Sequence, residues 1–254
     1  MIFIIFLFIA GIIAGIISTV TGMASLVSYP MLLAAGLSPV VANVTNTTGL
    51  VFAGFSSGIS SRQELKYNYR DLFWISPLIV IGGVIGSVLL LVFPNDVFEK
   101  IVPFMIFAVA IVFAVQPRLR LDDAVALDGY VPVKKTLTTV VLVFLIGVYG
   151  GYFGAAAGVF TLLVFSETPG LRLTVANAIK NVAGGMANLV ATIIFIFSGK
   201  VQWSAAIPMG VGFFVGGYIG PKIARYMPAK LLRWLIIIGA LILAGNMFYG
   251  AFIR

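Results

Sequence analysis

The sequence predicts an all-α protein that crosses a membrane many times, and three observations predict this fold class. Hydrophobic residues make up 61% of the 254 residues, charged residues make up 9%, and the mean hydropathy is +1.14. Soluble domains, in contrast, carry about 25% charged residues. The first charged residue is Arg62, so the chain before it is long enough for about three crossings of roughly 20 residues each. The apolar runs are too long and too uniform for the alternating strands of a membrane barrel.

Charges and turn signals divide the chain into apolar runs. The opening run lacks the basic start and small-residue exit of a signal peptide, so we interpret it as a retained helix. We expect membrane segments at residues 1–17, 20–35, 40–60, 71–93, 97–116, 136–166, 173–199, 203–222 and 229–253.

Polar or glycine-rich residues interrupt the apolar sequence at two places. The stretch "STVTG" (18–22) separates the first two segments, and "GGYFGAAAG" (150–158) lies inside the run 136–166. That run has 31 uncharged residues, too few for two full crossings of about 20 residues each. We therefore expect a hairpin in which one limb is broken or re-entrant.

The second half of the chain repeats the first. At an offset of 134 residues, "GLSPVVAN" (36–43) matches "GLRLTVAN" (170–177), and "GGVIG" (82–86) matches "GGYIG" (216–220). Upstream, "GIIAGIIS" (11–18) matches "GVYGGYFG" (147–154) at an offset of 136, which indicates that two residues were lost between the blocks. The pattern predicts an internal duplication.

Basic residues in equivalent loops predict that the two halves have opposite orientations. The loop 61–70 carries three basic residues, whereas its counterpart 198–203 carries only Lys200. The next pair of loops has the opposite bias, since 94–100 carries one basic residue and 221–233 carries four. Lys and Arg mark the cytoplasmic side of a membrane, so equivalent loops lie on opposite sides.

We therefore expect two inverted repeats. The first membrane repeat comprises residues 1–116, a polar cytoplasmic linker follows at 117–135, and the second membrane repeat comprises 136–254. Inversion requires an odd number of segments in each repeat. We expect five per repeat, with a broken or re-entrant hairpin opening each one and both termini outside the cytoplasm.

The composition argues against an enzyme and against a nucleic-acid-binding protein. The chain has no cysteine and no histidine, and its eight carboxylates fall in predicted loops or at helix ends. A membrane-embedded enzyme is therefore disfavoured, and we expect no metal and no cofactor. The net charge of +8 comes from basic residues in short loops, which indicates anchoring to the cytoplasmic face of a lipid bilayer rather than to nucleic acid.

Inverted repeats with interrupted helices are the architecture of secondary transporters, whose substrate binds near the bilayer midplane. The interruptions "STVTGMAS" (18–25) and "GAAAGVFT" (154–161) are candidate walls of such a site. Each places small residues beside the start of a half-helix, where free N–H groups attract anions.

Close helix packing is the alternative explanation for the glycines in these regions. We favour packing for Gly11, Gly15, Gly147 and Gly151. For Gly22 and Gly158 both explanations stay open, because the hydroxyls of Thr21, Ser25 and Thr161 lie beside them in the sequence.

The block "GMASLVSYPMLLAAGLSPVVANVTNTTG" (22–49), a second inverted copy, and "GGxxG" before a basic loop resemble the sulfite exporter TauE/SafE family. The resemblance covers nearly the whole chain, and 22–49 is its most specific part. It implies a transporter of the bacterial inner membrane that moves a small sulfur-containing anion, such as sulfite or a sulfonate. The glycine run near Gly22 is less rich than in the family, which bears on the shape of the pocket.

The family motif falls on "ANVTNTTG" and on its repeat "ANAIKNVAG". Spacings of three and four place Asn43, Asn46 and Thr47 on one helix face, and the same spacings place Asn177, Lys180 and Asn181 on another. An ionisable residue inside a membrane is a functional candidate by default. The two faces together therefore predict a pocket for an oxyanion.

Other interpretations stay open. Lys180 could instead extend its ammonium to the membrane surface, and Arg172 is either a topological charge or a vestibule residue. The function most favoured is a secondary anion transporter working by alternating access. A passive anion channel and a membrane-embedded enzyme are the alternatives, and a homodimer is compatible with the sequence.

Overall fold

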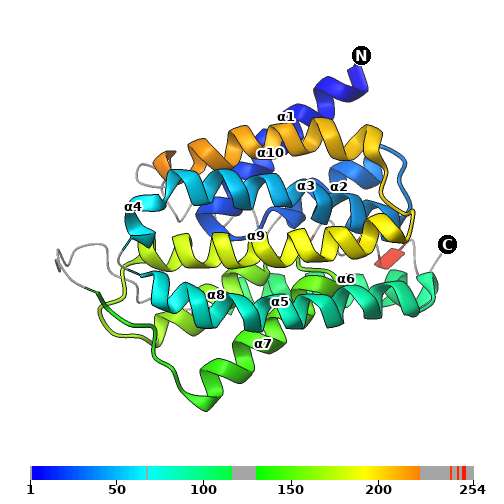
Figure 1. The fold of residues 1–254 in the computed structure, drawn as a ribbon. Coiled ribbons are helices and arrows are strands. Elements are labelled where there is room, and N and C mark those ends of the chain that lie inside the picture. The colour runs from blue at the N-terminus through cyan, green and yellow to red at the C-terminus, as the bar shows by residue number, and fades with distance from the viewer. Residues whose placement is uncertain are drawn as a thin grey trace.

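The computed structural model describes residues 2–66, 68–115 and 130–223, together with residues 241, 245, 248 and 249. This part of the chain is helical and contains no strand (Figure 1). Its helices are α1 (Ile2–Thr21), α2 (Ser25–Ala34), α3 (Pro39–Ser60), α4 (Arg62–Leu65), α5 (Tyr69–Val92), α6 (Asn95–Val115), α7 (Leu137–Tyr152), α8 (Ala157–Ser166), α9 (Leu173–Phe197) and α10 (Trp203–Ile223).

Each predicted segment that falls in the described ranges is a helix, with the run 136–166 divided into α7 and α8. The last predicted segment, 229–253, lies almost wholly outside the described residues. Among the described helices, α1, α5, α9 and α10 are long and apolar enough to cross a membrane. The chain is therefore an all-α, multi-pass membrane protein.

The helices pack in a row with α3 and α9 at its centre. In this row α1 packs on α10, α10 on α3, α3 on α9, α9 on α5, and α5 on α7. Figure 1 shows α3 and α9 between the other long helices. The central position explains the composition of α3, because its asparagines and threonines are buried within the protein. Large apolar side chains such as Phe73 on α5 and Phe197 on α9 are exposed instead.

The first interruption lies between α1 and α2 at residues 22–24, inside the predicted stretch 18–25, so α1 continues four residues beyond its predicted end at residue 17. The hydroxyl of Thr19 donates to Gly15 O and Ile16 O, and that of Thr21 donates to Ile17 O. These threonines therefore bond within the helix without interrupting it. The helix ends at Gly22, which has a φ of +79°. Glycine adopts such a left-handed conformation at little steric cost, because it has no Cβ atom.

The second interruption, at residues 153–156 between α7 and α8, has the same form. Gly154 has a φ of +74°, close to the value at Gly22. The half-helices that follow, α2 and α8, have 10 residues each. At about 1.5 Å per residue each is roughly 15 Å long, about half of a hydrocarbon core of roughly 30 Å. Neither half-helix spans a membrane alone.

The spacing of the two interruptions differs from that of the sequence blocks beside them. Gly22 and Gly154 are 132 residues apart, as are the starts of α2 at Ser25 and of α8 at Ala157, whereas the blocks 11–18 and 147–154 match at an offset of 136. Four residues (35–38) join α2 to α3, and six (167–172) join α8 to α9.

The glycines of α1 and α7 lie at close crossings with neighbouring helices. A Cβ atom at Gly15 would lie 2.9 Å from Phe213 O on α10, and one at Gly147 would lie 2.6 Å from Ile79 O on α5. Gly11 and Gly151 likewise face the backbones of α10 and α5. The predicted packing role of these four glycines is confirmed.

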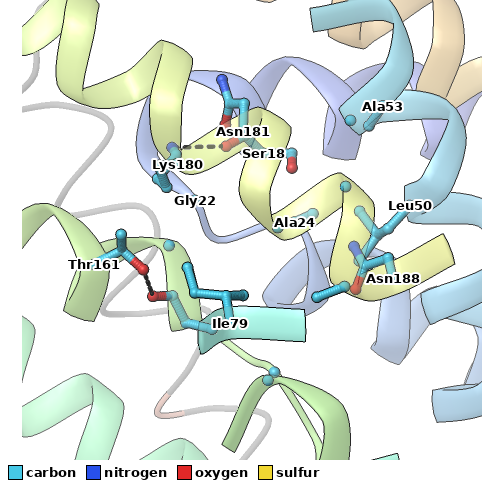
Figure 2. A pocket seen from close by; sticks show the side chains of 18 of the residues that line it. Ser18, Gly22, Ala24, Leu50, Ala53, Ile79, Thr161, Lys180, Asn181 and Asn188 are labelled. Atoms are coloured by element: carbon cyan, nitrogen blue, oxygen red, sulfur yellow. Dashed lines mark hydrogen bonds between the residues drawn. The ribbon is translucent and has the colours of Figure 1, made fainter. Parts of the chain in front are cut away.

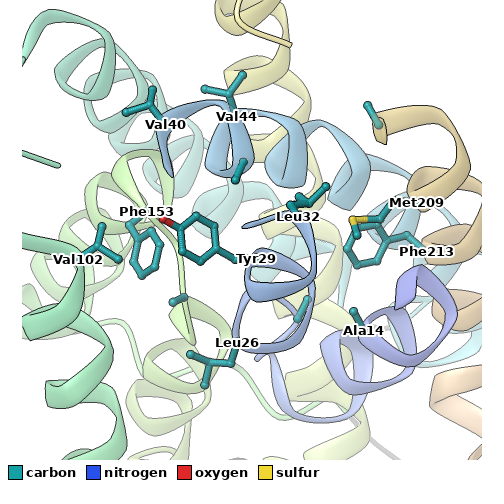
Figure 3. Close-up of a cluster of buried hydrophobic side chains, with 14 of the residues drawn as sticks. Ala14, Leu26, Tyr29, Leu32, Val40, Val44, Val102, Phe153, Met209 and Phe213 are labelled. Atoms are coloured by element: carbon teal, nitrogen blue, oxygen red, sulfur yellow. The ribbon is translucent and has the colours of Figure 1, made fainter. Parts of the chain in front are cut away.

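Aromatic side chains surround the second interruption. Phe153 makes an edge contact with Tyr29 of α2 at 5.4 Å between ring centroids, and its ring lies 5.8 Å from that of Phe98 on α6. Figure 3 shows the ring of Tyr29 beside that of Phe153 within the buried cluster. These contacts fix the end of α7 against α2 and α6.

The end of the predicted linker is attached to α5 through a buried carboxylate. Asp71 accepts hydrogen bonds from Trp74 Nε1, Tyr130 OH and the backbone N–H of Val133. The described end of the linker is therefore held against the start of α5.

Candidate functional site

A cavity of about 110 Å³ lies where the two interruptions meet the central helices. The ends of α1 and α7, the starts of α2 and α8, and the middle of α3, α5 and α9 form its walls (Figure 2). Leu50, Ile79 and Ile146 provide apolar surface, and small residues form much of the remainder. We call this space the central cavity.

Seven of the residues predicted for the site line the central cavity: Gly22, Ser25, Thr47, Gly158, Thr161, Lys180 and Asn181. Four others, Thr21, Asn43, Asn46 and Asn177, lie outside its lining. Arg172 is exposed at the position preceding α9. The structure thus brings together residues of both predicted interruptions and of the predicted polar faces of α3 and α9.

Lys180 is a buried cation at the wall of the central cavity. Its side chain is 4% exposed, and its Nζ donates to Asn177 Oδ1 at 2.8 Å and to Ser18 O at 3.3 Å. An ammonium has three donors, so one remains. No carboxylate in the described part of the chain makes a hydrogen bond or ion pair with it. The ammonium thus lies inside the protein, whereas that of a snorkelling lysine lies at the membrane surface.

Gly158 leaves room for the aliphatic chain of this lysine. A Cβ atom at residue 158 would lie 3.1 Å from Lys180 Cδ and 2.6 Å from Gly22 Cα. The sequence left open whether Gly22 and Gly158 allow close packing or form part of the site. In the structure they do both, since they pack against each other and line the central cavity.

The amides of α3 and α9 hold the ends of the two interrupted helices. Asn181 Nδ2 donates to Thr19 O in the last turn of α1 at 3.3 Å, and Asn43 Nδ2 donates to Tyr152 O at the end of α7 at 2.9 Å. The last carbonyls of a helix lack partners within it. Each central helix therefore satisfies the end of the interrupted helix that belongs to the other half of the chain.

Asn46 positions the first half-helix. Its Oδ1 accepts from Ser28 Oγ at 2.5 Å, and its Nδ2 donates to Ser25 Oγ at 3.1 Å. Because Ser25 Oγ is an acceptor in this contact, its own proton is available to a ligand in the central cavity. The backbone N–H of Ser25, at the first position of α2, also donates to no backbone carbonyl in the described part of the chain.

The hydroxyls of the three threonines predicted for the site are not available as donors to a ligand. Those of Thr21, Thr47 and Thr161 each donate to the carbonyl one turn earlier in the same helix. At Thr47 and Thr161 the central cavity therefore meets methyl groups and oxygen lone pairs.

The sequence prediction omitted Asn188. This residue lines the central cavity, and its amide makes no hydrogen bond to any residue that the structure describes. The helical spacing that selected Asn177 and Asn181 continues through Gly184 to Asn188 on the same face of α9. Extending that face by two turns would have found it.

Donors outnumber charged acceptors around the central cavity. Lys180 has a spare N–H, Asn181 has a second amide N–H, Asn188 has a free amide, and Ser25 has a free hydroxyl proton. Within the described ranges, no group of three or more His, Cys, Asp or Glu residues could hold a metal ion. One positive charge with several neutral donors is suited to a small anion.

Comparison with known proteins places the chain in a family. Residues 7–247 match the family described as "Sulfite exporter TauE/SafE". The chain is 30% identical to the "Probable membrane transporter protein ORF9" of Sinorhizobium sp over 239 residues, which is 94% of this chain and 90% of that protein.

Two further relatives have the same description. The chain is 28% identical to the "Probable membrane transporter protein YfcA" of Escherichia coli (strain K12), over 96% of this chain and 88% of that protein. It is 26% identical to a "Probable membrane transporter protein" of Haemophilus influenzae, over 96% of this chain and 93% of that protein. No solved structure matches the chain. With its helices long enough to cross a bilayer, this chain is a multi-pass bacterial membrane protein that belongs to the sulfite exporter TauE/SafE family of membrane transporters.

Proposed function

We propose that the protein is a secondary transporter that moves a small sulfur-containing anion, such as sulfite or a sulfonate, by alternating access. Lys180 carries this proposal, because a buried ammonium without a carboxylate partner lines a cavity rich in uncommitted donors. The relatives are described as probable membrane transporters, and the family is described by sulfite export. These descriptions support transport and direct attention to sulfur oxyanions.

The proposed architecture consists of two inverted repeats, residues 1–116 and 136–254, joined by a linker at 117–135. The relative direction of α3 and α9 supports inversion. Gly54 and Gly58 of α3 approach Gly185 and Val182 of α9, so residue numbers rise along one helix as they fall along the other. Equivalent helices that run antiparallel are typical of inverted repeats.

The packing order supports the same architecture. The row α1, α10, α3, α9, α5, α7 keeps its pattern when each helix is exchanged for its proposed equivalent, α1 for α7, α10 for α5 and α3 for α9. The half-helices follow this pattern, since α2 packs on α1 and α3, and α8 packs on α7 and α9. The central cavity then lies between the repeats, where transporters of this kind hold their substrate.

In the proposed site the residues have different roles. Lys180, Asn181, Asn188 and the Ser25 hydroxyl donate to the anion, and Gly22, Gly158, Thr47 and Thr161 set the shape of the central cavity. The remaining predicted residues, Asn43, Asn46 and Asn177, position helix ends and the lysine, and Arg172 is a vestibule charge. The apolar surface at Leu50, Ile79 and Ile146 would accept the carbon part of a sulfonate better than a second charge.

Transport and channel activity differ in a measurable way. Purified protein in liposomes should take up radiolabelled substrate with saturation, and unlabelled substrate inside the liposomes should accelerate uptake by exchange. A passive channel gives no such acceleration. Binding measured against sulfite, thiosulfate, sulfoacetate and sulfate should single out at least one of these anions. Failure of all four to bind would refute the proposed substrate class.

A further inference from the structure

A second, smaller cavity lies directly beyond the polar residues at the end of α1. Its volume is about 40 Å³, and Ser61, Glu64 and Asn177 are among the residues that line it. Thr19 and Asn181 line both cavities. These two residues, joined by the bond from Asn181 Nδ2 to Thr19 O, are therefore the partition between the central cavity and the second cavity.

We propose that this partition is a gate of the transport path and that an anion in the central cavity opens it. This inference rests on the proposed function. The same side chains serve two purposes, since Lys180 and Asn181 are the proposed ligands of the anion and also hold the carbonyls of Ser18 and Thr19. The spare N–H groups of Lys180 and Asn181 bind the anion first, and a shift of either side chain toward the anion then breaks its contact with the end of α1.

The lengths of these two hydrogen bonds favour such an exchange. Lys180 Nζ to Ser18 O and Asn181 Nδ2 to Thr19 O are each 3.3 Å, beyond the usual range of about 2.7–3.2 Å for N–H···O bonds. Hydrogen bonds to an ionised acceptor are roughly twice as strong as bonds between neutral groups. A charged oxyanion therefore competes well against neutral carbonyls for these donors.

The end of α1 adjoins the first interruption, so the loss of these two hydrogen bonds affects the backbone there. It is followed at once by Gly22, whose left-handed conformation begins the interruption before α2. Thr19 itself packs against Gly220 of α10. The gate therefore opens by movement of the Asn181 side chain and of the backbone at Gly22, while α1 keeps its packing on α10 at Gly11 and Gly15.

The second cavity is less suited to holding an anion than the central cavity is. Among the described residues that line it there is no lysine or arginine, and Glu64 is one of them, whereas Lys180 lines the central cavity. An anion is held less favourably beside a carboxylate than beside an ammonium. An anion that passes the gate is therefore released toward the loop that follows α3.

The natural absence of cysteine allows a direct test with single thiols. Gly184→Cys reports on the central cavity, because a Cβ atom there meets no atom within 4 Å. Ser61→Cys reports on the second cavity and identifies the side of the membrane on which it opens. A membrane-impermeant maleimide is applied to sealed vesicles from that side only, and the rate of labelling of Gly184→Cys is measured.

Loss of the Asn181 donor should open the gate without any anion. We expect Asn181→Val to accelerate labelling of Gly184→Cys roughly 2- to 10-fold, as the loss of one hydrogen bond implies. Asn181→Asp, which keeps the size but has no donor when ionised, should do the same. The matched control is Thr192→Val on the same helix, because the Thr192 hydroxyl makes no hydrogen bond to any residue that the structure describes and Thr192 lines neither cavity. Equal labelling rates in all three variants would overturn the gate.

The effect of the anion is tested by hydrogen exchange with sulfoacetate, which does not react with maleimides as sulfite does. The gate predicts faster exchange at the end of α1 and slower exchange in α9. Slower exchange in both would show that the anion binds but does not open the gate, so the inference would be wrong while the proposed function stood. No change anywhere would count against sulfoacetate as substrate, and the thiol experiment would still decide the gate.

Discussion

Lys180 has a different environment from every other basic residue in the described part of the chain, because it alone is buried. Its stem passes Gly158, and its ammonium lies between Asn177 and the end of α1. A buried cation without a counter-ion in the described part of the chain is unfavourable, and this supports the proposal that an anion supplies the missing charge during the transport cycle.

Lys180→Met should therefore abolish anion binding, because the substrate would be desolvated with only neutral donors. Lys180→Arg should retain part of the affinity, although a planar guanidinium does not reproduce the geometry of an ammonium. Substrate affinity and thermal stability are measured together on purified protein. A stable Lys180→Met variant with unchanged affinity would exclude Lys180 from the site.

Two asparagines on the central helices should respond differently to truncation. Asn188→Ala removes a free donor at the central cavity, so affinity should fall about 10- to 150-fold, as expected for one hydrogen bond to a charged partner. Thermal stability should not change, because Asn188 has no partner among the described residues.

Asn43→Ala should show the opposite pattern. Asn43 lies outside the lining of the central cavity and donates to Tyr152 O at the end of α7. Its loss leaves a buried carbonyl unpaired, at about 1–3 kcal/mol of stability. Thermal unfolding is the measurement. A variant as stable as wild type that had lost affinity would place Asn43 among the ligands of the anion.

At the scale of elements, the interruption after α1 depends on its glycine in two ways. Gly22 has a positive φ, and a Cβ atom there would lie 2.5 Å from Gly158 Cα. Gly36 also has a positive φ, of +89°, but a Cβ atom there meets nothing within 4 Å. Substitutions at Gly22 and Gly36 therefore separate the effect of backbone strain on stability from the effect of close packing.

Gly36→Ala should lower stability only by the strain of a left-handed residue, roughly 1–2 kcal/mol. Gly22→Ala should lower it further, because the half-helix α8 must also move away from α1. Thermal unfolding of both variants gives the comparison. Equal losses would mean that the contact between Gly22 and Gly158 contributes nothing beyond the backbone conformation.

At the scale of the whole molecule, the contacts of α3 predict which loops share a side of the membrane. Its start lies beside residue 202, where the backbone N–H of Gln202 donates to Thr45 Oγ1 at 3.1 Å. Its end lies beside the end of α10, where Ser60 Oγ donates to Tyr218 O at 3.1 Å. The loop after α3 and the loop after α9 are therefore at opposite ends of the bundle.

Topology reporters should follow this arrangement. Reporters after Arg62 and near Asp123 should read cytoplasmic, because these regions are rich in basic residues. Reporters near Asn95 and Lys200 should read external. If a reporter at Lys222 reads the same side as one at Asn95, the repeats are not inverted.

Local patterns in the sequence determine the segments and the polar faces of this protein. Apolar runs indicate where helices form, since burial of a helix in lipid depends on composition over about 20 residues. Helical spacing placed Thr47 with Asn43 on one face, and Asn181 with Asn177 on another.

Only the tertiary structure decided what each polar side chain does. Thr47 and Asn43 share a face, yet Thr47 lines the central cavity whereas Asn43 binds the end of α7. Helical spacing places Asn188 on the same face of α9 as Asn177 and Asn181, but only the tertiary structure shows that Asn188 lines the central cavity whereas Asn177 does not. The reason is physical, since helix periodicity is set by residues three and four apart, whereas a cavity and its donors depend on where helices distant in the sequence begin, end and cross.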